Sequence, residues 1–278
     1  MSVALHGLLL AGGRSSRMGR DKASLVLGSG GLTQAGRSLG LLRHFCGPVF
    51  LSLRDGQPIP SGAGDAPVLR DVPGVAGPLS GVLAALREAP GAAWLVMACD
   101  LPLVGPGVLA RLAARYAEDP SLPFVAYASA SDGLPEPLCA IYGPSALPVL
   151  QRHAERGHFC PRYILLEENA LLLPLPDAEA AALTNVNTPE DLAVAAPEFR
   201  EIRVAWFGHL AGRRGLREES LVTSVETVGA FRREMSDLHR LELDVPVIRV
   251  AVNDEFAPEE QRLRAGDKVV FLPPFAGG

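Results

Sequence analysis

A stretch near the N-terminus carries residue types that suit phosphate binding. It reads LLLAGGRSSRMGRDKA and runs from Leu8 to Ala23. An apolar run ends in Gly12 and Gly13, and several arginines and Lys22 follow. A glycine turn after a strand places backbone N–H groups at the carboxyl edge of a parallel sheet, where open α/β folds bind ligands. The cations suit a polyphosphate. The stretch predicts an anion-binding loop that is neither a P-loop nor a dinucleotide fingerprint; a solvated surface turn is the alternative.

Two aspartates follow other apolar runs. Asp100 comes directly after AWLVMAC, and Asp71 follows PVLR. A carboxylate at the end of a parallel strand emerges at the same sheet edge as the glycine loop, and it is a ligand type that Mg²⁺ prefers. The alternatives are a helix cap for Asp100 and a turn before Pro73 for Asp71.

The sequence ends in FLPPFAGG, so its last two residues are Gly277 and Gly278. A frayed end is one interpretation of such a pair. The apolar strand pattern before it favours another: a chain end without side chains can thread a narrow tunnel into a second protein.

The elements that would position these residues alternate between strand and helix. Apolar runs predict strands, and helical spacing with turn residues predicts the segments between them. The strands are expected at 7–11, 48–54, 67–72 and 93–99, and the helices at 32–45, 77–90 and 105–119. This alternation predicts an α/β fold with a parallel-type sheet. Near the end of this α/β region we expect a further helix, with Thr188 as its N-cap and Pro189 at its first position.

The pattern changes near residues 196–200. The segments that follow are a strand and polar turn (201–215), a strand and helix (221–235), a strand with a turn at Asn253–Asp254 (247–256) and a closing strand (265–274). These predict a small α+β domain with its own core. We therefore expect two domains, 1–196 and 201–278.

Composition excludes several classes of protein. The net charge of −5 argues against a general nucleic-acid binder. Neither a membrane span nor a signal peptide is evident, and four scattered cysteines favour a reduced, cytoplasmic protein. The histidines show no ligand spacing, and the neighbours His158 and Cys160 fit a loop better than zinc.

Several motifs together resemble the molybdenum cofactor guanylyltransferase family. They are LAGGRSSRMGRDK, GPLSGVLAAL, CDLP, PEPLCAIY and NVNTPEDL, spread in family order over residues 8–192. The resemblance implies a Rossmann-like nucleotidyltransferase domain. It also implies transfer of GMP from GTP to molybdopterin, with Mg²⁺ as cofactor and pyrophosphate as leaving group.

The resemblance also implies roles for individual residues. Lys22, Asp100 and Arg17 would be catalytic, with Asp100 binding the metal. The nucleotide would be held by Leu10, Ala11, Gly12, Gly13, Lys22, Asp71 and Asp100.

One position departs from the family pattern. Leu53 stands where the family usually has an asparagine close to the nucleotide, so cytidylyl transfer from CTP stays an alternative. His158 and Arg162 are expected near the pterin, with a plain loop as the alternative.

Residues 201–278 resemble the small sulfur-carrier subunit of molybdopterin synthase, a ubiquitin-like β-grasp protein. IRVAWFGHLAGRRG, VAVNDEFA and LRAGDKVVFLPPFAGG carry this likeness. It implies a Gly278 thiocarboxylate, made by an adenylating and sulfurating enzyme and used by the large synthase subunit. Phe207, Leu272 and Phe275 would form the partner surface, with core packing as the alternative for the first two.

Each half of the chain has an alternative function. The C-terminal domain is either a sulfur carrier or a pure interaction module. The N-terminal domain acts either on molybdopterin or on another phosphorylated acceptor.

Overall fold

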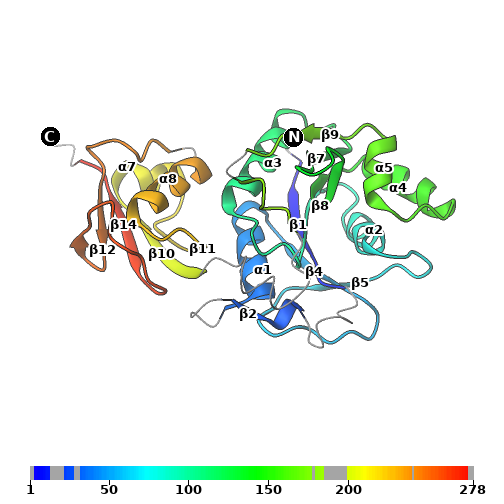
Figure 1. The fold of residues 1–278 in the computed structure, drawn as a ribbon, viewed down its shortest axis with the longest axis horizontal. Helices are drawn as coiled ribbons and strands as arrows, with labels where there is room; N and C mark the ends of the chain where they lie inside the picture. Colours follow the sequence, from blue (N-terminus) through cyan, green and yellow to red (C-terminus); the bar gives the residue numbers. More distant parts are fainter. Residues whose placement is uncertain are drawn as a thin grey trace.

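A computed structural model describes residues 3–12, 22–27, 32–176, 179–184, 199–239 and 241–274; for Lys22 and Leu27 it describes the backbone alone. Within these ranges the chain forms two sheets, of seven and five strands, and a separate two-stranded hairpin (Figure 1). The predicted helix after Thr188 lies outside the described residues. So does the predicted boundary at 196–200 in part, and the exact domain limits stay a prediction.

The first sheet contains seven strands. They are β1 (Leu5–Leu10), β4 (Val49–Leu53), β5 (Val68–Arg70), β6 (Ala93–Ala98), β7 (Phe124–Ala128), β8 (Pro135–Tyr142) and β9 (Leu171–Leu173). Their order is β5-β4-β1-β6-β8-β7-β9. The strands β5, β4, β1 and β6 are parallel, as the sequence predicts.

The strand β8 is antiparallel to both of its neighbours, β6 and β7. The reason is the short connection that precedes it. The backbone N–H of Ser129 donates to the carbonyl of Leu134 at 2.8 Å, and Gly133 adopts a φ of 71°. This turn returns the chain at once, whereas a parallel partner would need a crossover of a dozen or more residues. The sheet is therefore mostly parallel rather than wholly so.

Helices cover both faces of this sheet. One face carries α1 (Gln34–Phe45) and α3 (Pro106–Glu118); the other carries α2 (Pro78–Glu88), α4 (Ala146–Glu155) and α5 (Pro161–Glu167). A single-turn helix, η1 (Lys22–Ser24), and the hairpin β2 (Val26–Leu27) and β3 (Leu32–Thr33) precede α1. All six residues of β6 are buried, which is typical of a central strand covered on both sides.

The second sheet has the topology of a ubiquitin-like β-grasp. Its strands are β10 (Arg200–Trp206), β11 (Glu218–Thr223), β12 (Arg249–Val252), β13 (Glu255–Phe256) and β14 (Lys268–Leu272), and its helices are α7 (Gly208–Arg214) and α8 (Val228–His239). The order is β11-β10-β14-β12-β13, with β10 and β14 parallel. The face under α8 buries Trp206, Phe231, Met235 and Phe271.

Two local predictions for this domain have different outcomes. The turn predicted at Asn253–Asp254 is confirmed: both residues have positive φ, 50° and 71°, as a tight hairpin between β12 and β13 requires. The polar turn expected after β10 is wrong, because α7 occupies that position. Leu210 anchors this helix in the core, and Gly215 ends it with a φ of 70°.

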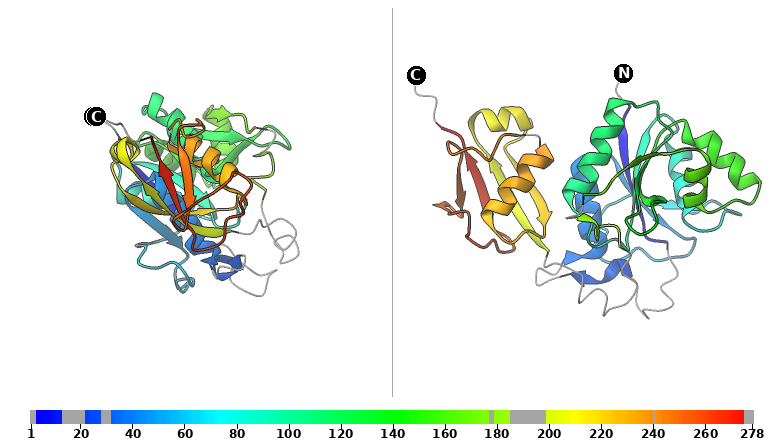
Figure 2. Two further views of the ribbon diagram at one scale, coloured as in Figure 1. Left: turned by 90° about the vertical axis from the view of Figure 1, so that its left-hand side faces the viewer. Right: turned by 45° about the horizontal axis from the view of Figure 1, so that its top comes forward.

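The β-grasp domain packs against one side of the larger domain. The helix α3 lies beside α8, and α1 lies beside β11 (Figures 1 and 2). Arg37 of α1 is buried; its guanidinium donates to the carbonyl of Val104 and lies 3.9 Å from the ring centroid of Phe199. Burial raises the pKa of Glu234 in α8 to about 7, although the charge of Arg37 opposes this shift.

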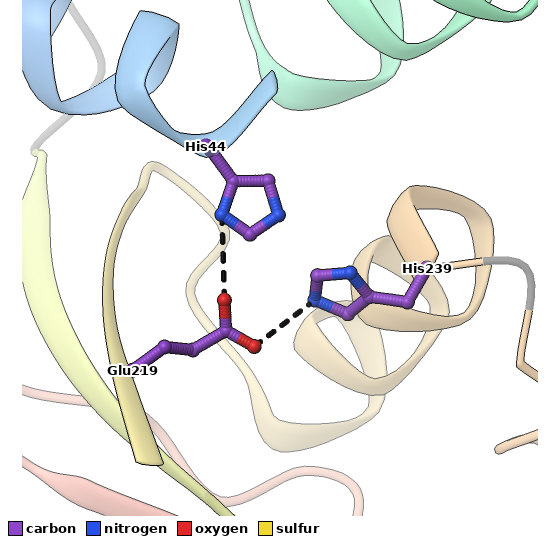
Figure 3. A group of neighbouring side chains, drawn as sticks. All are labelled: His44, Glu219 and His239. Atoms are coloured by element: carbon purple, nitrogen blue, oxygen red, sulfur yellow. Dashed lines mark ion pairs between the residues drawn. The ribbon is translucent and has the colours of Figure 1, made fainter. Parts of the chain in front are cut away.

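A second polar contact joins the domains (Figure 3). His44 of α1 places Nδ1 3.4 Å from one carboxylate oxygen of Glu219 in β11, and His239 of α8 places Nε2 3.5 Å from the other. Burial is the main cause that lowers the pKa of both histidines, and that of His239 falls to about 3. Both imidazoles are therefore neutral at physiological pH.

None of the described helices combines the length and the apolar character that crossing a membrane requires. The four cysteines are free, as expected from their spacing. Three of them are buried, whereas Cys160 is exposed.

Candidate functional site: the carboxyl edge of the seven-stranded sheet

The backbone after β1 is held between the ends of two neighbouring strands. The N–H of Ala11 donates to the carbonyl of Ser52 at the end of β4, at 3.0 Å. On the other side, the N–H of Cys99 after β6 donates to the carbonyl of Leu10 at 2.9 Å. Leu10, Ala11 and Gly12 therefore lie at the centre of the carboxyl edge, where the sequence places them.

The two predicted aspartates leave the same edge. Asp100 follows β6 and is half-buried, and Asp71 follows β5. The N–H of Asp71 donates to the carbonyl of Leu53 at 3.2 Å, which ties the start of this loop to the end of β4. Burial raises the pKa of Asp71, and the positive charge of Arg54 partly offsets this rise. The edge thus combines a central backbone turn with carboxylates on both sides.

The arrangement suits a hard divalent cation at Asp100. Its carboxylate is an oxygen donor at the sheet edge, and Mg²⁺ commonly takes one or two protein carboxylates together with substrate phosphates and water. Gly13, Arg17, Gly277 and Gly278 lie outside the described residues, as does the side chain of Lys22, so their predicted roles stay predictions.

Two residues that the sequence analysis missed lie beside this turn. The side-chain amide of Gln57 donates to the carbonyl of Ala11 at 2.9 Å. Arg54 lies next to Gly12, where an added Cβ would stand 3.4 Å from its backbone nitrogen and its Cγ. Arg70 holds this loop by donating to the carbonyls of Arg54 and Gln57 at 2.8 and 2.9 Å. Arg54 and Gln57 both follow β4. Asp71 was identified because it follows the end of a strand, and the same reasoning would also have identified these two residues.

The helix α2 approaches this edge closely. Gly77 precedes it with a φ of 71°, and Pro78 occupies its first turn. Gly81 faces β1 and β4, where an added Cβ would lie 2.3 Å from the Ser52 Oγ and 2.8 Å from the Leu10 Cδ2. Close packing behind the turn therefore explains why Gly81, the second glycine of the GPLSG motif, has no side chain.

The structure describes three further residues that the sequence analysis singled out. Leu53 is fully buried, so its side chain packs in the core. Arg162 in α5 forms ion pairs with Asp132 at 2.9 Å and Glu136 at 2.7 Å, which places it in a salt-bridge network. His158 is exposed, and its backbone N–H donates to the carbonyl of His153 at 2.9 Å.

The predicted partner surface of the β-grasp domain is described in part. Phe207 is 53% exposed, so the core-packing alternative does not hold for this residue. Leu272 is half-buried and packs beside Ala205, Ala251 and Val270. Phe275 lies outside the described residues.

A comparison with known families identifies both halves. Residues 7–169 match the model of the MobA-like NTP transferase domain. The chain belongs to the MobA-like NTP transferase family. Residues 204–278 match the ThiS family, which agrees with the ubiquitin-like topology of the second sheet. The resemblances stated from the sequence motifs are thus confirmed.

Similar proteins agree with this assignment. A molybdenum cofactor biosynthesis bifunctional protein from Synechocystis is 37% identical over 67% of this chain, and the match spans 52% of the relative's length. A probable molybdenum cofactor guanylyltransferase from Mycobacterium avium is 34% identical over 70% of this chain and 96% of its own length. The crystal structure of molybdopterin-guanine dinucleotide biosynthesis protein A from Archaeoglobus fulgidus matches 68% of this chain and 96% of its own, with a TM-score of 0.53 and 26% identity.

Proposed function

We propose that the MobA-like domain transfers GMP from GTP to molybdopterin and releases pyrophosphate. The observation that carries this proposal is the meeting of the Leu10–Gly12 backbone, Asp71 and Asp100 at one sheet edge in a chain of this family. The names of the relatives from Synechocystis and Mycobacterium avium support the acceptor and the base.

The reaction needs positioning and charge neutralisation rather than a protein nucleophile. A terminal phosphate oxygen of molybdopterin forms a bond to the α-phosphorus of GTP, and the bond from that phosphorus to the bridging oxygen of pyrophosphate breaks. The Leu10–Gly12 backbone and Gly13 orient the nucleotide, and Asp71 lies along it. Arg17 and Lys22 neutralise phosphate charge, and Asp100 would hold Mg²⁺, which supplies further neutralisation when bound.

Residues close to Leu53, where the family usually has an asparagine, are candidates for recognising the nucleotide base. Because Leu53 is buried, we infer that its side chain does not read the base. Gln57 brings a side-chain amide to Ala11, and Arg54 lies beside Gly12. These two residues are the polar candidates near the nucleotide, and CTP stays the alternative donor.

A panel of nucleotides tests the domain's reaction. Purified full chain, Mg²⁺ and molybdopterin would be incubated with GTP, CTP, UTP or ATP, and the products separated by chromatography. The expected product is the guanine dinucleotide form of the cofactor. Transfer from CTP would support the alternative, and transfer to a sugar phosphate but not to molybdopterin would overturn the proposal.

We further propose that the ThiS domain carries sulfur as a thiocarboxylate on Gly278. An activating enzyme would join AMP to the carboxylate with release of pyrophosphate, and a sulfur donor would then displace AMP. The large subunit of molybdopterin synthase would take the sulfur. The ThiS match and the exposed Phe207 support this role. Intact-mass spectrometry after treatment with such an enzyme, ATP and a sulfur donor should show one oxygen replaced by sulfur; an unchanged mass favours a pure interaction module.

A further inference from the structure

Two clusters of imidazole and carboxylate groups lie among the described residues, away from the nucleotide edge. One is His44, Glu219 and His239 between the domains, and the other is His153 on α4, Glu167 on α5 and His158 in the connection between these helices. In each cluster three possible ligand atoms lie within 4.8 Å of one another. The sequence analysis saw no ligand spacing, because the fold brings these residues together from separate elements.

The charges of the interdomain cluster argue against a cation there (Figure 3). Arg214 donates to both carboxylate oxygens of Glu219 at 2.9 Å, and the Trp206 indole donates to the same carboxylate at 2.7 Å. The carboxylate is therefore already neutralised and hydrogen-bonded. A divalent ion between His44 and His239 would meet the Arg214 guanidinium without a second negative charge.

The cluster on α4 and α5 has the opposite charge balance. His153 is near the end of α4, and its backbone carbonyl receives the N–H of His158 at 2.9 Å, which holds the two residues together. Glu167 is the last residue of α5, with a carboxylate oxygen 3.7 Å from the Nδ1 of His153. Glu168 lies on the other side of the ring, 2.9 Å from Nε2. The two carboxylates beside these imidazoles match the charge of one divalent ion.

The hydrogen bond to Glu168 decides which nitrogen of His153 is available. An ionised carboxylate accepts only, so Nε2 is the nitrogen that donates to Glu168, and Nδ1 is the nitrogen that faces Glu167. This side chain is 7% exposed, and within the described structure its buried Nδ1 has no hydrogen-bond partner. A buried lone pair that faces a carboxylate is costly unless a cation or a proton lies between them.

We propose that His153, His158 and Glu167 form a binding site for a divalent transition-metal ion of the zinc class. Glu168 is the positioning residue, since a carboxylate on the second ring nitrogen fixes the tautomer and orientation of a metal-bound histidine. Three protein ligands leave the fourth tetrahedral position to water. The proposal is independent of the nucleotidyl transfer and sulfur-carrier roles.

The site must contract to bind the ion, and the residues that must move are free to do so. Zinc is held at about 2.0–2.2 Å by nitrogen and oxygen ligands, closer than the present separations allow. His158 is exposed, and the Glu167 side chain is 63% exposed. His153 is the buried, fixed member of the site.

The test measures zinc binding by the metal-stripped full chain in competition with a chromophoric chelator. We expect one tight equivalent, and Co²⁺ in its place should show the visible bands of a tetrahedral complex. His158→Ala removes an exposed ligand without touching the core and should weaken Zn²⁺ binding by more than about 100-fold. Glu168→Gln keeps an acceptor but loses the charge, and should weaken it by about 10-fold.

Two histidine variants serve as controls. His209→Ala removes an exposed histidine on α7, and His44→Ala disrupts the interdomain cluster; both should leave zinc affinity unchanged. The proposal would be overturned if the wild-type protein bound Zn²⁺ no more tightly than the His158→Ala variant does. Loss of binding in His44→Ala but not in His158→Ala would also overturn it.

Discussion

Individual residues at the sheet edge divide into those that we propose to act on a ligand and those that hold the edge in place. Asp100 and Asp71 present carboxylates there, whereas Arg70 donates to backbone carbonyls of the loop after β4. Substitutions in the first group should affect catalysis alone, and substitutions behind the turn should affect folding as well.

Asp100→Ala should lower kcat for nucleotidyl transfer by on the order of 100-fold or more, because it removes the proposed metal ligand. The thermal unfolding midpoint should stay near that of the wild type. Asp65→Asn is the matched control, since this exposed aspartate pairs with Arg43 at the surface, where ion pairs contribute little. Mg²⁺-dependent turnover at the wild-type rate in Asp100→Ala would remove Asp100 from the site.

Gly81→Ala should destabilise the chain by roughly 1–3 kcal/mol, because its Cβ would overlap Ser52 and Leu10 behind the nucleotide turn. Chemical denaturation measures this change. Gly91→Ala is the control, since nothing lies within 4 Å of its added Cβ. Adding Ser52→Ala to Gly81→Ala removes the closest clashing atom and should restore part of the loss. Equal stability of the two glycine variants would contradict the packing argument.

At the scale of elements, helices of the larger domain contact a strand and a helix of the β-grasp domain among the described residues. The pairs are α1 with β11 and α3 with α8. Of the groups around His239, His44 comes from α1, Glu219 from β11 and Arg214 from α7. Burial disfavours the charged forms of His44 and His239, so protonation of these two histidines should weaken the contact.

The pKa of His239 is lowered from 6.5 to about 3, chiefly by burial. The unfolded chain therefore binds a proton below pH 6.5 that the folded chain does not, and the free energy of unfolding falls as pH decreases from 6.5 toward 3. Between pH 6.5 and 5 this loss amounts to about 2 kcal/mol. His239→Phe keeps an aromatic ring against Trp206 and should remove this loss in thermal unfolding at several pH values.

Glu234 has the opposite effect on the pH dependence. Its pKa is raised from 4.5 to about 7, so stability from this group falls as pH increases through that window. Because Glu234 is present in both proteins, the difference between wild type and His239→Phe isolates the histidine. His209→Phe, at an exposed position, should retain the wild-type pH profile. An identical acid profile in His239→Phe would refute the assignment.

At the scale of the whole molecule, two folds with separate cores share one chain. In Figures 1 and 2 the strands β12 and β14 lie on the side of the β-grasp domain away from the larger domain. The nucleotide edge belongs entirely to the larger sheet. The two proposed activities therefore use separate surfaces.

Deleting Gly277 and Gly278 should abolish thiocarboxylate formation while nucleotidyl transfer keeps its wild-type rate. Mass spectrometry and the dinucleotide assay, applied to the same preparation, measure the two outcomes. Asp100→Ala is the reciprocal control, since it should form the thiocarboxylate normally. A joint loss of both activities in either variant would show that the domains do not act separately.

The sequence by itself determined the alternation of the main strands and helices from β1 to α3, the change of pattern near residue 200 and the position of Leu10–Gly12, Asp71 and Asp100 at strand ends. These follow from local signals: apolar periodicity, glycine turns and the motifs after each strand. The antiparallel β8 was missed because strand direction depends on the length of its connection. The helix α7 was missed because Leu210 is its one buried residue, which leaves little apolar periodicity to recognise.

Only the tertiary structure decided which distant residues meet. Gln57 reaches Ala11, His44 reaches Glu219 and His239, and His153 turns its free nitrogen toward Glu167. None of these pairings has a spacing that could be recognised along the chain, since each joins separate elements. Burial, which is the main cause of the pKa shifts of His239 and Glu234, likewise arises only in the folded chain.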